Sequence, residues 1–339
     1  VLVMVDSQYH KISTLELKTL EESILYESNL GTNVVTNQHY LALATALDVS
    51  TYLDLEVRNA RGEIITQMPW KENWKSIVGW VNDEELLIDA PYEQKIPVSA
   101  YKVNPFTRQI QELSTDYPNI YPAYPPVLWD EFMFVETVYH PTFNFVLYPA
   151  FDDSTPVVVW DVSNEASILT FPTNQFYGHT PKWSPDGNSF VINASIAPEL
   201  KILDRRKKEE LFQVGLNDEI TQLTRFTEDY DDVTLGNFSW SPDGKSIAFW
   251  VKTAPGPLDQ AVDHLAVFEF GSNEVIEFCL PGIRFGWNSH GPIWTGNNKY
   301  LIIESQNAKD ENIIYLVDIE KSEIQSIAKD CIPIGITSD

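Results

Sequence analysis

Short runs of alternating apolar and polar residues fill this chain from end to end. They are separated by clusters of Asn, Asp, Gly and Pro, and no long stretch has the spacing of an amphipathic helix. Two segments are nearly identical: PKWSPDGNSFVI at 181–192 and FSWSPDGKSIAF at 238–249. Each predicts a strand, a tight turn and a second strand, because Pro fixes φ, Asp bonds its own backbone and Gly accepts a positive φ.

A large residue precedes each predicted turn and is expected to anchor one sheet against the next. Weaker copies of the pattern place this anchor at Val34, Trp80, Tyr139, Trp183, Trp240 and Trp294. Successive anchors lie roughly 45 to 60 residues apart, a spacing typical of one four-stranded propeller blade per repeat.

A second pattern follows in each repeat: an apolar strand, a polar turn and another apolar strand. It predicts the two outer strands of each blade. It recurs at 53–68, 98–113, 157–171, 265–278 and 313–327, with a weaker copy at 200–212. In the weaker copy we interpret the charged run 205–208 as the turn between the strands.

The seventh copy is split between the two chain ends. Residues 1–5 and 11–27 supply three strands, and 332–339 reads as an inner strand without a blade of its own. We expect the C-terminal strand to complete the N-terminal blade, because this pairing removes an exposed sheet edge. The sequence thus predicts an all-β fold, a seven-bladed β-propeller with four-stranded antiparallel blades, as a single domain over 1–339. The predicted blades are 1–30 with 332–339, 31–72, 75–115, 132–172, 179–226, 234–280 and 290–330.

The Trp-Ser-Pro-Asp-Gly turn followed by an apolar strand resembles the repeat of TolB-like β-propellers, the Pro-Asp-Gly relatives of WD-repeat propellers. The strict motif covers two blades, at 183–187 and 240–244, and 220–226 resembles an outer strand of that family. The resemblance implies binding through loop faces, often to proteins or glycans. It transfers no functional residue, because the shared motif is a structural turn. TolB itself resembles a six-bladed propeller with an N-terminal domain, and neither feature matches this chain.

Charge and composition exclude several classes of partner. The formal net charge is −26, which repels nucleic acids and anionic membrane surfaces. No apolar run approaches the length of a membrane span. Cys279 and Cys331 fall in different predicted blades, so we expect two free thiols, which do not fix the compartment. The N-terminus lacks the pattern of a signal peptide and an initiator Met, so we expect that upstream residues have been removed.

Catalytic motifs are absent from the sequence. The six histidines show no metal-ligand spacing, and the nucleophile elbow of hydrolases does not occur. Residues 243–246 resemble the end of a phosphate-binding loop, but Ser239 stands where that loop requires Gly. The acidic clusters 152–153 and 229–232 are interpreted as solvated loops, with a loosely bound calcium ion as the alternative.

The candidate site comes from the placement of loops. In a propeller, the connections between the second and third strands and those between blades emerge on one face, and here these connections are long and aromatic. Binding residues concentrate in loops, and Trp and Tyr present large rigid rings to sugars and protein partners. Alternatively, the same rings only cap the blade cores. The candidate ligand-binding residues are Trp70, Trp74, Tyr121, Trp129, Tyr177, His179, Tyr230, Trp287 and His290.

The function favoured by the sequence is a non-catalytic binding or scaffolding propeller that recognises a protein or glycan. We expect a monomer outside the cytoplasm, periplasmic or secreted, without a cofactor and without a nucleic acid partner. One alternative is a metal-dependent hydrolase or lyase with its site at the mouth of the central channel, where Glu136 and the acidic loops would supply oxygen ligands. Another is that the chain is the propeller domain of a larger protein.

Overall fold

Seven four-stranded sheets make up the computed structural model of the chain. It describes residues 1–6, 10–28, 30, 32–46, 51–89, 99–114, 138–141, 144–148, 157–161, 164, 166–171, 181–196, 208–254, 262–278, 291–306 and 311–337. Within these ranges every regular element is a β-strand, apart from the single-turn 3-10 helix η3 (Phe226–Glu228). We number the sheets as blades 1 to 7 in chain order.

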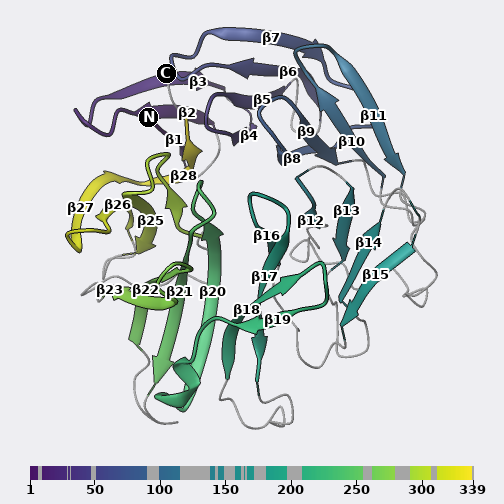
Figure 1. Ribbon diagram of the computed structural model, residues 1–339. Coiled ribbons are helices and arrows are strands. Elements are labelled where there is room, and N and C mark those ends of the chain that lie inside the picture. The colour runs from purple at the N-terminus through teal and green to yellow at the C-terminus, as the bar shows by residue number, and fades with distance from the viewer. Residues whose placement is uncertain are drawn as a thin grey trace. The chain divides into compact units, whose positions relative to one another are not determined.

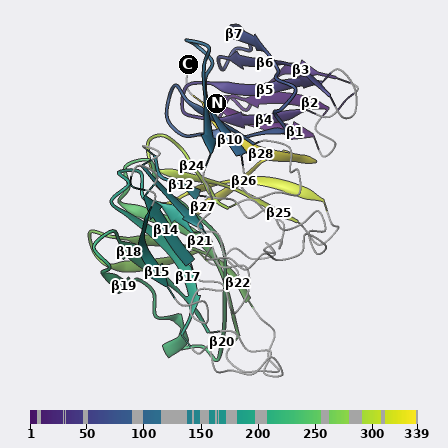
Figure 2. The ribbon, with the colours of Figure 1, turned by 90° about the vertical axis from the view of Figure 1, so that its right-hand side faces the viewer.

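Blades 1 to 3 belong to one compact unit, formed by Val1–Pro126, Glu311–Leu316 and Gln325–Asp339. Blade 1 has the strand order β28 (Cys331–Ile336), β1 (Leu2–Asp6), β2 (Lys11–Leu15) and β3 (Glu22–Glu27). Blade 2 consists of β4 (Asn33–Thr36), β5 (Leu41–Ala46), β6 (Tyr52–Arg58) and β7 (Ile64–Pro69), which lie side by side in Figure 2. Blade 3 consists of β8 (Ser76–Trp80), β9 (Leu86–Asp89), β10 (Ser99–Asn104) and β11 (Gln109–Ser114).

The second compact unit is formed by Val127–Asp310 and Val317–Ile324. Blade 4 consists of β12 (Val138–Tyr139), β13 (Phe145–Tyr148), β14 (Val157–Asp161) and β15 (Ala166–Phe171). Blade 5 consists of β16 (Lys182–Trp183), β17 (Ser189–Ser195), β18 (Glu209–Gly215) and β19 (Ile220–Gln222). Blade 6 consists of β20 (Asp232–Trp240), β21 (Ser246–Ala254), β22 (Val262–Glu269) and β23 (Glu274–Phe278). Blade 7, whose residues are divided between the two units, has the order β24 (Ile293–Trp294), β25 (Tyr300–Gln306), β26 (Asn312–Asp318) and β27 (Glu323–Lys329).

The strand orders confirm a seven-bladed β-propeller with one blade shared by the two chain ends. In blade 1, β28 pairs antiparallel with β1, in a register that runs from Leu2 opposite Ile336 to Asp6 opposite Cys331 (Figure 1). The Val1 ammonium donates to the Thr337 carbonyl at 3.0 Å, and the Thr337 N–H donates to the Val1 carbonyl at 3.0 Å. The predicted closure of the N-terminal blade by the C-terminal strand is therefore present.

The apolar core of each unit lies between successive blades. In the first unit, Leu55 and Val57 of blade 2 pack with Leu86, Ile88 and Val103 of blade 3 in one buried cluster. Alternating residues of each strand face the neighbouring sheet, which explains the period of two along the sequence. Burial of these β-branched and aliphatic side chains is the main contribution to the stability of the stacked sheets.

A fixed set of hydrogen bonds closes the Ser-Pro-Asp-Gly turn that follows the first strand. In blade 5, the Ser184 N–H donates to the Ser189 carbonyl at 2.8 Å and the Gly187 N–H donates to the Ser184 carbonyl at 2.9 Å. The Ser184 hydroxyl donates to Asp186 Oδ1 at 2.6 Å. Gly187 has φ +72°, the left-handed conformation that Gly adopts without strain.

Blades 6 and 7 repeat this turn with small changes of residue. The Ser241 hydroxyl donates to Asp243 Oδ1 at 2.8 Å, and the Thr295 hydroxyl donates to Asn297 Oδ1 at 2.8 Å. In blade 7 the positive φ falls on Asn298, at 59°, because Asn tolerates this conformation better than most residues. The turn chemistry predicted from the two strict motifs therefore extends to a third blade.

In blades 6 and 7 the anchor residue at the end of the inner strand contacts the preceding blade. The Trp240 indole N–H donates to the Lys182 carbonyl at 3.1 Å, and the Trp294 indole N–H donates to the Ser239 carbonyl at 3.1 Å. In both cases the acceptor is the residue directly before the anchor of the preceding blade. The anchor therefore sets the height of one inner strand against the next.

In blade 2 the anchor position belongs to Thr36, and the prediction of Val34 was wrong. Thr36 is the last residue of β4, and the following Asn37 N–H closes the turn to the Tyr40 carbonyl at 3.0 Å. Thr36 contacts the preceding blade at Gly335, where an added Cβ would lie 2.0 Å from Thr36 Oγ1. Because Thr36 and Gly335 are both small, they contact each other without a large residue that would mark the anchor in the sequence. The prediction therefore placed the anchor two residues too early, at Val34.

The outer strands of blade 5 also differ from the prediction. The segment 200–212 was expected to supply both, but the pair consists of β18 and β19, in a register that runs from Phe212 opposite Gln222 to Val214 opposite Ile220. Their turn contains Asn217 and Asp218, and Asp218 has φ +66°. The run of four basic residues looked like a turn by charge, whereas Asn217-Asp218 supplies the conformation that a hairpin requires.

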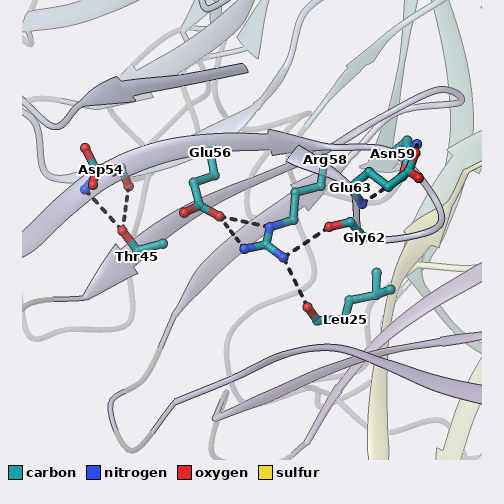
Figure 3. A network of polar contacts seen from close by, with 8 residues as sticks. All are labelled: Leu25, Thr45, Asp54, Glu56, Arg58, Asn59, Gly62 and Glu63. Atoms are coloured by element: carbon teal, nitrogen blue, oxygen red, sulfur yellow. Dashed lines mark hydrogen bonds and ion pairs between the residues drawn. The ribbon is translucent and has the colours of Figure 1, made fainter. Parts of the chain in front are cut away.

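Arg58 connects the outer strands of blades 1 and 2 (Figure 3). Its Nε and Nη2 donate to Glu56 Oε2 at 2.9 and 2.6 Å, so the guanidinium is neutralised where the two side chains are only 14% and 10% exposed. Its Nη1 donates to the carbonyls of Leu25 in β3 and Gly62 in the β6–β7 hairpin, both at 3.2 Å. A planar guanidinium makes these bonds together, which a lysine ammonium does not do with the same geometry.

The two cysteines remain only partly described. Cys331 lies in β28, where its Sγ is 3.6 Å from Met4 Sδ of the neighbouring strand β1. Cys279 lies outside the described residues. The expectation of two free thiols therefore stays a prediction, as does the assignment of all seven blades to a single domain.

We expect the Gly335→Ala variant to lose stability, by about 1–3 kcal/mol, because its new methyl group overlaps Thr36 Oγ1. Urea denaturation of the single variants and of Gly335→Ala/Thr36→Ala measures the effect. Removing the Thr36 hydroxyl should recover much of the loss, which gives a favourable coupling energy in the double-mutant cycle. Equal losses in Gly335→Ala and in the double variant would contradict the proposed contact.

The Asp186 and Asp243 turns should make stability depend on acid pH. Hydrogen bonds from Ser184 and Ser241, followed by those from backbone N–H groups, lower the pKa of both carboxyls. A carboxyl whose pKa is lower in the folded chain stabilises the fold above its unfolded pKa of about 4, and the contribution is lost as the pH falls through the folded pKa.

The variant Asp186→Asn/Asp243→Asn should therefore lose less stability than the wild type between about pH 5 and pH 2. Asn297 occupies the same place in blade 7, so the substituted turns have a native precedent. Urea midpoints measured across this range test the expectation. Parallel pH profiles for variant and wild type would show that these carboxyls do not contribute.

Candidate functional site

Five polar and aromatic residues gather where the connections of blades 2 and 3 emerge. Tyr52 begins β6, Trp70 directly follows β7, and Tyr101 lies in β10, while Asn73 and Trp74 belong to the connection between the two blades. In a four-stranded meander these positions share one end of the blades. We call the five residues the rim cluster.

The rings of the rim cluster form a continuous chain of contacts. The centroids of Tyr52 and Trp70 are 4.9 Å apart, and those of Trp70 and Trp74 are 5.3 Å apart with the rings nearly perpendicular, at 89°. The Trp74 and Tyr101 centroids are 6.4 Å apart. Tilted and edge-to-face arrangements at these distances are favourable, because the positive ring edge meets the negative ring face.

Hydrogen bonds hold the connection in this conformation. The Trp70 N–H donates to the Leu53 carbonyl at 3.0 Å, which extends the β6–β7 pairing by one residue, and the Trp74 N–H donates to the Lys71 carbonyl at 2.9 Å in a tight turn. The Trp70 indole N–H donates to the Trp74 carbonyl at 3.1 Å. Asn73 Nδ2 donates to the Tyr101 hydroxyl. The segment is therefore fixed by bonds from both blades before any ligand binds.

Burial divides the rim cluster into a support and an outer layer. Trp74 and Tyr101 are only 4% and 7% exposed, so they pack in the core between blades 2 and 3. Tyr52 and Trp70 are half-buried, and Asn73 is exposed. A ligand would therefore meet Tyr52, Trp70 and Asn73, while Trp74 and Tyr101 hold these residues from below.

Both tyrosines of the rim cluster stay neutral near physiological pH. Burial raises the pKa of Tyr52. Burial and the Glu112 carboxylate raise the pKa of Tyr101, and the hydrogen bond from Asn73 partly opposes them. Neutral phenols both donate and accept hydrogen bonds, which suits uncharged hydroxyl or amide groups of a ligand.

Tyr230 is the third predicted site residue that the structure describes, and it belongs to the second unit. It follows η3 and is partly buried against the core cluster of blade 6. The Lys208 ammonium donates to its carbonyl at 2.8 Å. The buried Glu210 carboxylate accepts hydrogen bonds from the Thr224 hydroxyl at 2.5 Å and from the Thr227 N–H at 2.7 Å. These bonds fix the backbone before Tyr230, so this tyrosine has a defined place in the connection between blades 5 and 6.

Trp70 and Trp74 thus contact each other, whereas Tyr230 belongs to the second compact unit. The remaining predicted site residues lie outside the described ranges, so their roles stay predictions: Tyr121, Trp129, Tyr177, His179, Trp287, His290 and the proposed metal ligand Glu136. The sequence analysis missed Tyr52, Asn73 and Tyr101. The tyrosines occupy strand positions near the connections between second and third strands, which was the available signal.

Two searches of the described residues bear on other functions. Among these residues, no three or more His, Cys, Asp or Glu side chains form a group that could hold a metal ion. The same part of the chain has no helix long and apolar enough to cross a membrane.

Comparison with known proteins identifies the fold. No family model and no curated protein matches the sequence. An oligogalacturonate lyase solved in complex with manganese matches with a TM-score of 0.60 and 11% identity, over 96% of this chain and 83% of the lyase. A puromycin hydrolase matches with a TM-score of 0.58 and 12% identity, over 96% of this chain and 51% of the hydrolase.

TolB from Acinetobacter baumannii is also among the matches, with a TM-score of 0.48 and 9% identity, over 98% of this chain and 66% of TolB. This chain thus spans slightly less than two thirds of TolB and about half of the hydrolase. At such low identities the likeness to the lyase and the hydrolase, with TM-scores of 0.60 and 0.58, shows a shared β-propeller fold, which the resemblance of the repeat predicted.

The two tryptophans of the rim cluster should differ in their effect on stability. Trp74→Ala removes a buried ring and should cost about 3–5 kcal/mol, whereas Trp70→Ala removes a half-buried ring and should cost about half as much or less. Urea denaturation at neutral pH measures both. Equal costs would show that Trp70 is as much a part of the core as Trp74.

Proposed function

We propose that this protein is a non-catalytic binding propeller that recognises a glycan or a protein segment with its rim cluster. The observation that carries the proposal is the chain of ring contacts that runs from the half-buried Tyr52 and Trp70 to the buried Trp74 and Tyr101. Because packing already fixes these rings, the binding of a ligand to their exposed surface costs little further side-chain entropy.

The chemistry around the rings suits a polar, flat ligand. Sugars and peptide segments stack on Trp and Tyr with their apolar faces and hydrogen-bond at their edges. Asn73, Lys71 and Glu72 are exposed beside Trp70 and supply donors and acceptors for those edges. The net charge of −26 argues against a nucleic acid, so a glycan or protein ligand is preferred.

The enzyme alternative has one observation in its favour. The fold resembles that of an oligogalacturonate lyase in complex with manganese and that of a puromycin hydrolase. The resemblance is one of fold, which hosts many functions, and it assigns no residue of this chain to catalysis. A metal-dependent lyase or hydrolase therefore remains the second candidate.

The proposal includes a monomeric protein outside the cytoplasm, periplasmic or secreted, that binds without a cofactor. It also allows the propeller to be part of a longer protein. The match to the puromycin hydrolase covers only 51% of that protein, so this fold occurs within longer chains.

A glycan and peptide array should identify ligands that bind the wild type, and Trp70→Ala should weaken each true hit by about tenfold or more, because an anchor ring carries much of the binding free energy. Trp70→Phe should retain part of the affinity, since it keeps a ring. Affinities are measured by isothermal titration calorimetry on the hits.

The matched control is Phe270→Ala, which removes a half-buried ring from the β22–β23 hairpin, away from any connection between blades. It should leave the affinities within about twofold. The proposal fails if Trp70→Ala and Phe270→Ala affect the hits equally. It also fails if the protein cleaves oligogalacturonate when manganese is added, which would favour the lyase.

A further inference from the structure

A second aromatic cluster lies at the other end of blades 2 and 3, where hairpins join the first to the second strand and the third to the fourth. Tyr40, Trp80 and Phe106 are each half-buried there. The Tyr40 centroid is 5.1 Å from that of Phe106 and 6.1 Å from that of Trp80, and the Trp80 and Phe106 centroids are 6.4 Å apart. These rings, together with Asp83 and Glu84, are called the hairpin patch.

Asp83 is held beside the rings by the turn that follows Trp80. Asn82 Oδ1 accepts hydrogen bonds from the N–H groups of Glu84 at 2.9 Å and Glu85 at 2.8 Å, so the turn has a fixed conformation. The Asp83 side chain is 72% exposed, and its Oδ2 lies 4.0 Å from His39 Nε2. The first carboxylate of the patch is therefore open to solvent.

Glu84 is connected to the turn that carries Phe106. Asn104 Nδ2 donates to Glu84 Oε2 at 3.5 Å, and Asn104 Oδ1 accepts the hydrogen bond of the Phe106 N–H at 3.1 Å. Glu84 is exposed. Two exposed carboxylates thus border a set of aromatic rings built from two blades.

Trp80 departs from the other anchors of the repeat. The indole N–H groups of Trp240 and Trp294 donate to the preceding blade, whereas Trp80 Nε1 has no hydrogen-bond partner among the described residues. This Nε1 is buried, and the ring stacks on Phe106 with the planes 29° apart, as the ring of Trp240 stacks on Phe270. Trp80 contacts the preceding blade through Tyr40, and part of each of the three rings stays exposed.

We propose that the hairpin patch binds a cationic segment of a partner protein, with Lys or Arg side chains over the rings and their charges facing Asp83 and Glu84. Cations are attracted to the faces of Trp, Tyr and Phe, and Arg also stacks on them. The net charge of −26 steers a basic partner towards this protein. The site is independent of the rim cluster, which lies at the opposite end of the same blades.

Charge selects this partner over the other occupants of an aromatic surface. An apolar or acidic segment placed on the rings would remove Asp83 and Glu84 from water without a counter-charge, which is unfavourable. A basic segment supplies that charge and keeps the apolar stems of its side chains on the rings. The structure therefore assigns a basic peptide to the hairpin patch.

Fluorescence anisotropy with labelled octa-arginine at about 150 mM salt tests the proposal, because distant charges are largely screened there. The wild type should bind octa-arginine and should not bind octa-glutamate. Phe106→Leu keeps an apolar side chain but removes a ring, and it should weaken binding about fivefold. Asp83→Asn/Glu84→Gln should weaken binding by a similar factor.

The matched control for charge is Asp218→Asn/Glu219→Gln, which removes the same charge from the β18–β19 hairpin of blade 5. It should change the affinity by less than about twofold. Equal effects of the two charge variants would show general attraction to an acidic protein and would overturn the proposal. Unchanged affinity in Phe106→Leu, with circular dichroism like that of the wild type, would overturn it too, as would no binding of octa-arginine.

Discussion

The contact between an inner-strand anchor and the blade before it, present in blades 2, 6 and 7, is the constraint on which the remaining structure depends. Trp240 and Trp294 satisfy it with a hydrogen bond to a backbone carbonyl, and Thr36 satisfies it by close approach to Gly335. For the two tryptophans the acceptor is the residue directly before the preceding anchor. Such a contact fixes both the spacing and the height of two inner strands, so the buried faces of the sheets meet in register.

The turn after the anchor must fix the register of the first hairpin for that contact to form. A shift of one residue in the first hairpin would point the anchor to the opposite face of the sheet. The Ser or Thr hydroxyl bonded to Asp or Asn, and the positive φ three residues after that Ser or Thr, exclude this shift. Short-range turn chemistry and packing between blades thus specify the same register, as expected of a sequence that encodes one structure.

The sequence predicted those parts of the fold in which a local pattern and a large side chain coincide. Blades 5 to 7, with Trp anchors and tight turns, are of this kind. Blade 2 is not of this kind. The small size of its anchor Thr36 is explained only by the contact with Gly335, which comes from the other end of the chain. In blade 5 the hairpin between the outer strands lies at Asn217 and Asp218, which had an ordinary composition and did not stand out beside the basic run 205–208.

The residues of the candidate site could likewise be predicted only where a local pattern in the sequence marked them. Trp70 and Trp74 stand out as tryptophans in a polar connection, and the structure places them in contact. Their partners Tyr52 and Tyr101 lie on strands distant in sequence, so no local pattern joins them to the connection. Nor does composition separate the buried Trp74 from the half-buried Trp70, because that difference arises only when blades 2 and 3 pack together.

The indole N–H groups of the tryptophans differ in what they bind. Trp240 and Trp294 use it to bind a different blade, so their rings are committed to the fold. Trp70 uses it within its own connection, at the Trp74 carbonyl, and Trp80 has no acceptor among the described residues. Trp70 and Trp80 are half-buried tryptophans at the two ends of blades 2 and 3 whose indole N–H does not bond to the preceding blade, and the proposed binding surfaces are built on them.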